Sequence, residues 1–144
     1  MVTDITELSF DEIAEGAEVS RDYVISPSVY DGFLAAFGDR SPIHVDDDYA
    51  RARGFDEKVM HGAILNGFVS ELIGVQFPGR RALLLSVDLR YANPSYLGDE
   101  LRIEATVAQK IESQHVIVLK LRIQNLTQNS LAASGRAQVR VAEE

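Results

Sequence analysis

The sequence contains no cysteine, which excludes disulfide bonds, thiolate catalysis and cysteine-ligated metal sites. Basic residues are also scarce, since 14 Lys and Arg against 22 Asp and Glu give a formal net charge of −8 at pH 7. Because phosphate backbones are bound by clustered Lys and Arg, this balance argues against nucleic acid as a partner. An anionic ligand would have to be held by local basic groups.

No apolar run is long enough to cross a membrane. The most apolar stretch, residues 63–77, is shorter than the roughly 20 residues of a membrane-spanning helix, and it contains Asn66 and Glu71. The N-terminal segment carries acids where a secretory signal has a basic segment and an apolar run. We therefore expect a soluble, cytoplasmic protein with no membrane partner, in which residues 63–77 form a buried core helix.

The chain length of 144 residues suits one hydrophobic core and is too short for two ordinary ones. We expect one domain over residues 1–144, with the polar and acidic residues 1–17 at its periphery. Apolar residues alternate at period two over residues 19–25 and predict a first strand. Ser28 is expected to cap a short helix that ends at Gly38.

Three consecutive aspartates, Asp46 to Asp48, precede the segment YARARGF. Acids therefore stand where a helix begins, and Arg51 and Arg53 stand where it ends, which matches the helix dipole. Gly54 is expected to end this helix. Because the dipole explains the acids without a bound ion, we expect no metal site here.

From Arg81 onward the pattern changes from helical to alternating and predicts four strands. Short polar links between the last three strands imply antiparallel neighbours. The residues predicted to share the apolar face are Leu83, Leu85, Val87, Leu89, Tyr91, Leu101, Ile103, Ala105, Val107, Ile117, Leu119, Leu121, Ile123, Leu131, Ala133, Ala137, Val139 and Val141. That face must be covered, and the helix over residues 63–77 is the only segment apolar enough to cover it. The predicted fold is α+β, with a curved antiparallel sheet wrapped around a long central helix.

The candidate chemistry lies just before this helix. Gly38 and Pro42 interrupt helical structure around Asp39 and His44, so we expect both to be loop residues that are free to converge. Gly62 stands at the start of the helix, where first-turn amides have no partner and receive negative charge. A carboxylate, an imidazole and such amides are the groups needed to move a proton on and off a carbon beside a polarised carbonyl.

A strand, a buried helix and a meander wrapped around it form the hot-dog arrangement. Within it, GDRSPIH at residues 38–44, DxxYA at 46–50 and HG at 61–62 resemble the R-specific enoyl-CoA hydratases of the MaoC-like family, and NPSYLGDEL at 93–101 is similar too. This resemblance implies addition of water to a trans-2-enoyl thioester to give the R-3-hydroxyacyl thioester, or the reverse dehydration. It also implies a homodimer, CoA or acyl carrier protein as the thioester carrier, and no further cofactor.

The resemblance assigns roles residue by residue. Asp39 and His44 correspond to the catalytic pair, which would hold one water and perform both proton transfers. Gly62 corresponds to the backbone N–H that holds the thioester oxygen. Ser41 stands where the family usually has an asparagine that orients the water and the acid, and Phe37 replaces a small hydroxyl residue. The serine motivates an alternative from another class, an acyl-thioester-binding module without efficient chemistry.

Glu71 supports a further alternative. A carboxylate in the middle of an apolar helix is costly unless it is paired or solvated. Some hot-dog thioesterases use a carboxylate on this helix to drive attack of water on the thioester. The competing interpretation is an acid at the dimer interface or tunnel mouth that pairs with an arginine. His61 is expected to cap or pack at the helix start rather than to act in catalysis.

Five other residues are candidates for substrate binding. Ser70, Ile73 and Val75 lie where an acyl chain would run if the helix lines the tunnel, although core packing explains the two aliphatic residues equally well. Arg80 and Arg81 follow a Pro-Gly turn and would meet CoA phosphates, or would simply be solvated, as arginines in exposed turns usually are.

Overall fold

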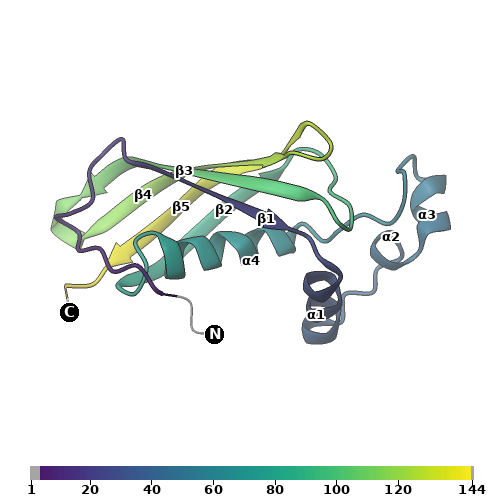
Figure 1. Ribbon diagram of the computed structural model, residues 1–144, viewed down its shortest axis with the longest axis horizontal. Helices are drawn as coiled ribbons and strands as arrows, with labels where there is room; N and C mark the ends of the chain where they lie inside the picture. Colours follow the sequence, from purple (N-terminus) through teal and green to yellow (C-terminus); the bar gives the residue numbers. More distant parts are fainter. Residues whose placement is uncertain (1–3, 144) are drawn as a thin grey trace.

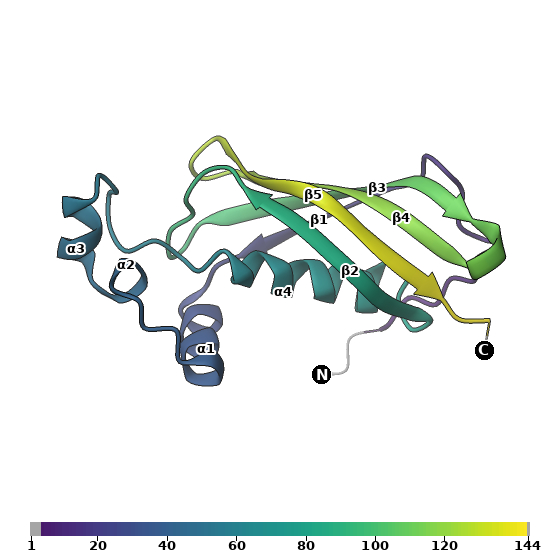
Figure 2. The same ribbon diagram turned by 180° about the vertical axis from the view of Figure 1, so that it is seen from behind.

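The computed structural model describes residues 4–143, in which an antiparallel sheet of five strands curves around one long helix (Figure 1). The strand order is β1-β3-β4-β5-β2, with β1 at Glu18–Val24, β2 at Ala82–Tyr91, β3 at Glu100–Ile111, β4 at Val116–Asn125 and β5 at Ser130–Val141. Helix α4 (Ala63–Glu71) continues into a π-helical turn, Leu72–Gln76, and lies along one face of the sheet (Figure 2). The predicted α+β hot-dog fold is confirmed.

Most of the core between the helix and the sheet consists of residues that the period-two and helical patterns predict, although Leu131 is only half-buried. Ile64, Leu65, Val69, Leu72 and Ile73 are buried on the helical side. Burial of each such aliphatic side chain contributes about 1.5–3 kcal/mol. The predicted inward residues that are buried on the sheet side are Leu101, Ile103, Ala105, Val107, Ile117, Leu119, Leu121, Ile123, Ala133, Ala137, Val139 and Val141.

The predicted inward face is wrong in part of β2. Pairing with β5 shifts register between Leu84 and Ser86, so that Leu85 is an extra residue in a β-bulge. Because side chains alternate along a strand, one extra residue reverses the faces of the residues that follow it. Leu83 and Leu85 are 57% and 42% exposed, and Tyr91 is exposed as well. The residues of β2 that pack against the core are Ala82, Leu84, Val87 and Leu89.

Three short helices lie beyond one end of the sheet (Figure 1): α1 (Pro27–Phe37), α2 (Pro42–Val45) and α3 (Asp47–Ala52). The predicted cap of α1 at Ser28 is wrong, because the Ser26 hydroxyl accepts from the Val29 N–H at 3.2 Å. Pro27 lacks an N–H and has a helical φ, so it suits the first helical position. Gly38 ends α1 in the left-handed region, at φ 69°, as predicted.

The prediction that His44 lies in a loop is also wrong. Ser41 is extended, with φ −51° and ψ 135°, as expected before a proline, but Pro42 then begins the single turn α2 that carries His44. Asp46 caps α3 by accepting from the Tyr49 N–H at 3.1 Å, as the acidic run predicts.

The N-terminal segment is bonded to the sheet and to the end of the central helix. The Thr6 N–H donates to the Val75 carbonyl at 2.9 Å, and the Gly16 N–H donates to the Val107 carbonyl at 2.8 Å. Phe10 and Ile13 are buried. Residues 1–3 of the predicted peripheral segment lie outside the described residues. No helix within residues 4–143 has the length and apolarity to span a membrane.

Gly135 in β5 lies where the backbone of β2 approaches most closely. A Cβ added at Gly135 would stand 1.7 Å from the Asp88 carbonyl oxygen. We expect Gly135→Ala to push β2 from β5 and to lower the free energy of unfolding by about 1–3 kcal/mol. Gly32→Ala is the control, because nothing lies within 4 Å of an added Cβ and alanine favours the helix interior. Denaturant unfolding measures both, and equal stability of the two variants would contradict the expectation.

Candidate active site

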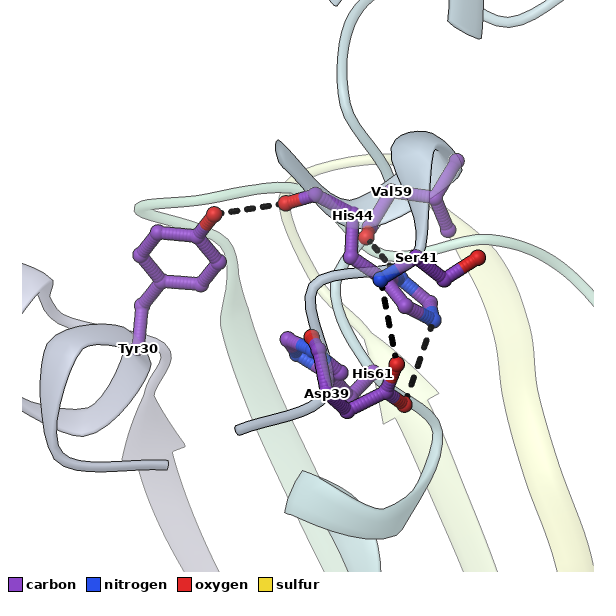
Figure 3. A network of polar contacts seen from close by, with 6 residues as sticks. All are labelled: Tyr30, Asp39, Ser41, His44, Val59 and His61. Carbon is purple, nitrogen blue, oxygen red and sulfur yellow. Dashed lines mark hydrogen bonds and ion pairs between the residues drawn. The ribbon is translucent and has the colours of Figure 1, made fainter. Parts of the chain in front are cut away.

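Two hydrogen bonds hold His44, one to its main-chain carbonyl and one at a ring nitrogen (Figure 3). Its Nδ1 lies 2.7 Å from the Val59 carbonyl oxygen. Because a carbonyl only accepts, Nδ1 carries the proton and the lone pair of the neutral ring is on Nε2. The Tyr30 hydroxyl donates to the His44 carbonyl at 2.5 Å, and burial raises the pKa of Tyr30, which keeps the hydroxyl a donor. The hydrogen bonds with Val59 and Tyr30 therefore fix the direction in which the Nε2 lone pair points.

Asp39 faces this nitrogen. Its Oδ2 lies 4.0 Å from the His44 Nε2, which is too far for a direct hydrogen bond. Two atoms that each hydrogen-bond to one water oxygen at about 2.8 Å are separated by about 4–4.5 Å. The Asp39 side chain is 50% exposed, so solvent reaches it. The two groups are thus spaced to share a single water molecule.

Ser41 contacts the acid through its main chain. The Ser41 N–H donates to Asp39 Oδ1 at 3.2 Å, and the Ser41 hydroxyl points away from that carboxylate (Figure 3). The contact with the acid at this position is thus made by the backbone amide and not by the serine side chain.

Gly62 is the N-cap residue of α4 and borders the same site. Within residues 4–143 no acceptor bonds its N–H, as expected at a helix start. The Tyr91 ring covers the glycine, because a Cβ added at Gly62 would stand 3.0 Å from two of its atoms. The Tyr91 hydroxyl donates to Asn66 Oδ1 at 2.6 Å, and burial raises the pKa of this phenol.

A cavity of about 330 Å³ is bordered by His44 and Gly62. His44, His61 and Gly62 line its polar end, and its apolar walls include Ile25, Phe55, Met60, Leu65 and Tyr91. The sequence reasoning missed these apolar residues as candidates. Leu65 had a usable signal, since it lies three positions after Gly62 and therefore on the same side of the helix. The others come from separate segments that only the fold brings together.

The five predicted substrate-binding residues do not line this cavity. Ser70 is exposed, Ile73 is buried in the core, and Val75 is half-buried in the π-helical turn. Arg80 and Arg81 follow that turn, at the end of the sheet opposite α1, α2 and α3 (Figure 1). Arg81 Nε lies 3.3 Å from Glu7 Oε1, and its guanidinium also donates to the Glu143 carbonyl.

Glu71 lies in the last turn of α4 and is paired. Its Oε2 accepts from the Tyr23 hydroxyl at 2.5 Å and lies 3.7 Å from Arg21 Nε. Its Oε1 accepts from Gln76 Nε2 at 3.1 Å. Burial, followed by the bond to Glu71, raises the pKa of Tyr23, so the phenol remains a donor. These contacts agree with the interpretation of Glu71 as an acid paired with an arginine.

Asp39, His44 and His61 also have potential metal-ligand atoms within 4.8 Å of one another. The two imidazole rings are stacked, with centroids 4.0 Å apart and an interplanar angle of 29°. Imidazole lone pairs lie in the ring plane, and these planes are too close to parallel for both to reach one ion at about 2 Å. The three residues therefore fit an acid–base site better than a metal site.

A helix wrapped by an antiparallel sheet, with an acid and a histidine beside its N-terminal amides, defines a hot-dog protein with an acid–base site. The model of the MaoC like domain matches residues 10–129, which is most of the chain. The chain belongs to the MaoC-like family, and the resemblance seen in its motifs is confirmed.

Three known proteins illustrate the relationship. The (R)-specific enoyl-CoA hydratase of Aeromonas caviae is 30% identical over 131 residues, 90% of this chain and 95% of that protein. The 3-hydroxybutyryl-CoA dehydratase of Methylorubrum extorquens is 30% identical over 111 residues, 77% of this chain and 71% of that protein. The unliganded R-hydratase PhaJ1 from Pseudomonas aeruginosa matches with a TM-score of 0.88 and 27% identity, over 99% of this chain and 90% of that one.

The close packing of Tyr91 on Gly62 makes the helix start sensitive to a single methyl group. We expect Gly62→Ala to displace the ring or the amide and to lower kcat for a bound enoyl thioester about tenfold or more, because misplacement by about 1 Å costs up to 10²-fold. Gly67→Ala on the same helix is the control, since no atom lies within 4 Å of its added Cβ. Steady-state kinetics measure kcat for both variants, and equal kcat values would refute this role of Gly62.

Proposed function

We propose that the chain catalyses R-specific addition of water to trans-2-enoyl-CoA, giving 3-hydroxyacyl-CoA, and the reverse dehydration. The observation that carries the proposal is the 4.0 Å spacing of Asp39 Oδ2 and His44 Nε2 beside the Gly62 amide and an apolar cavity. Relatives named as (R)-specific enoyl-CoA hydratase and 3-hydroxybutyryl-CoA dehydratase, at about 30% identity over most of the chain, support it.

The pair performs both proton transfers of the reaction. The water oxygen bonds to C3 of the enoyl group while the lone pair on His44 Nε2 accepts a proton from the water. The Asp39 carboxylate stabilises the imidazolium that forms. The pair then returns one proton to C2 as the enolate collapses, so that both groups end in their starting state. Dehydration is the same sequence in reverse.

Gly62 supplies the third element. As water adds, negative charge develops on the thioester oxygen, and the free N–H at the start of α4 is placed to donate to it. The apolar walls of the cavity suit an acyl chain next to this carbonyl. We propose that no further cofactor takes part, because hydration is redox-neutral and the two side chains account for both proton transfers. CoA or acyl carrier protein would serve as the carrier.

The acid and the base are tested by replacing each with an amide side chain, which does not act as a base near neutral pH. We expect Asp39→Asn and His44→Gln each to lower kcat at least about 10²-fold, since general acid–base catalysis contributes about 10²–10⁴-fold. Loss of absorbance of the conjugated thioester in trans-2-butenoyl-CoA measures the rate. Glu71→Gln makes the same carboxylate-to-amide change outside the cavity and should retain turnover.

The same variants separate the alternatives. Release of free CoA thiol that disappears in Glu71→Gln and survives in Asp39→Asn would favour a thioesterase. Calorimetric binding of acyl-CoA without turnover at any chain length would favour the binding module. Full activity in both Asp39→Asn and His44→Gln would refute the hydratase proposal.

The cytoplasmic location predicted from the sequence stays a prediction.

We also propose that the protein is a homodimer joined through the free edge of β2. Within residues 4–143 this ten-residue strand is paired only with β5, and it exposes Leu83 and Leu85. A long apolar edge strand is a template for pairing with another chain. Tyr91, at the end of the same strand, lines the cavity, so dimerisation would place the partner next to the active site.

The dimer is tested by placing a charge on this edge. We expect Leu83→Lys to yield monomers, because a buried unpaired ammonium would oppose association. Val24→Lys is the matched control, since Val24 is an exposed aliphatic residue at the end of β1, the opposite edge of the sheet. Sedimentation velocity gives the mass of each variant. A Leu83→Lys protein that remains dimeric would exclude this edge as the interface.

A further inference from the structure

We propose that His61 is a positioning residue: its ring holds the Asp39 main chain in place and supports the His44 imidazole. The assignment rests on the proposed function, because it explains what keeps the acid and the base at the spacing of one water. It also goes further than the packing or capping role expected for His61 from the sequence.

The first contact is a hydrogen bond to the loop that carries the acid. His61 Nε2 lies 2.8 Å from the Asp39 carbonyl oxygen, so Nε2 carries the proton and donates. Residues 38–41 belong to no helix or strand. Their other hydrogen bonds within the described chain reach residues no more than four positions away. The bond from His61, 22 residues away, is therefore what fixes Asp39 to the rest of the fold.

The second contact is ring stacking. The centroids of the His61 and His44 rings are 4.0 Å apart. The His61 ring also lies beside Phe33 and Tyr30, with centroids 4.5 Å and 6.0 Å apart. The side chain is 3% exposed, so the ring has no room to turn away. One buried side chain thus touches both Asp39 and His44, and Figure 3 shows it beside Asp39.

The remaining ring nitrogen argues against a purely packing role. His61 Nδ1 is buried and has no hydrogen-bond partner in the described part of the chain. An unsatisfied buried acceptor is destabilising, whereas a phenylalanine ring would fill this space without one. The imidazole is thus a poor choice for packing alone and a suitable one for donating from Nε2 to Asp39.

Two substitutions separate the donor from the ring. His61→Phe keeps a flat ring and removes the donor, whereas His61→Gln places an amide N–H near the position of Nε2. With trans-2-butenoyl-CoA we expect His61→Phe to lower kcat about 10²-fold with KM changed less than about threefold. His61→Gln should recover at least about tenfold of that loss. A packing role predicts the opposite order of activity.

His115→Phe is the matched control, because His115 also stacks on an aromatic ring, Phe10, with centroids 4.7 Å apart, but does not line the cavity. Its kcat should stay within about twofold of wild type. A His61→Phe enzyme within threefold of wild type, or a His61→Gln enzyme as slow as His61→Phe, overturns the proposal. If His61→Phe does not fold, His61→Asn replaces it, because its shorter amide does not reach the Asp39 carbonyl.

A second readout is independent of turnover. Wild-type protein that fails to hydrate any enoyl-CoA would refute the proposed function alone. The positioning role is then decided by ¹H–¹⁵N spectra, in which the Asp39 and Arg40 amide resonances should move more in His61→Phe, or its Asn substitute, than in His61→Gln. Equal movement in both variants overturns it.

Discussion

The burial of α4 by the curved sheet is the constraint on which the rest of the structure depends. Its aliphatic side chains, from Ile64 to Ile73, meet the inward rows of β3, β4 and β5, and no other segment is apolar enough to replace it. A helix held in this way has fixed ends. Its first amides emerge at one end of the sheet, where Gly62 borders the cavity, so packing in the core positions the N–H that we propose as the donor to the thioester oxygen.

The acid and the base are held differently, by a few hydrogen bonds, most of which come from other segments of the chain. His44 is oriented through the Val59 carbonyl, and Asp39 through His61 and the Ser41 amide. Most of these partners are main-chain groups or residues of the helix start. The site therefore depends on the same packing as the core, although Asp39 itself is half exposed. Rigid support beneath a solvent-accessible acid is the arrangement that acid–base chemistry on one water requires.

Several errors in the predictions have one cause, which is that local patterns do not report register. Period two in β2 gave a single inward row, but the bulge at Leu85 divides it and leaves Leu83 and Leu85 exposed. The assignment of Ser70, Ile73 and Val75 to the acyl chain assumed that the helix lines the tunnel, and it stays a prediction. The cavity in the structure lies at the start of α4 and takes its walls from Ile25, Phe55 and Tyr91, which are far apart in the sequence.

The sequence by itself determined the class of fold, the central helix, the inward rows of the last three strands apart from Leu131, and the residues proposed for chemistry. It did so because hydrophobic periodicity and short motifs are local properties of the chain. Only the tertiary structure decided that Asp39 Oδ2 and His44 Nε2 are 4.0 Å apart, that the lone pair is on Nε2, and that His61 contacts both residues. Those facts depend on hydrogen bonds and ring contacts between segments 15 to 22 residues apart, whose geometry exists only once the sheet has closed over the helix.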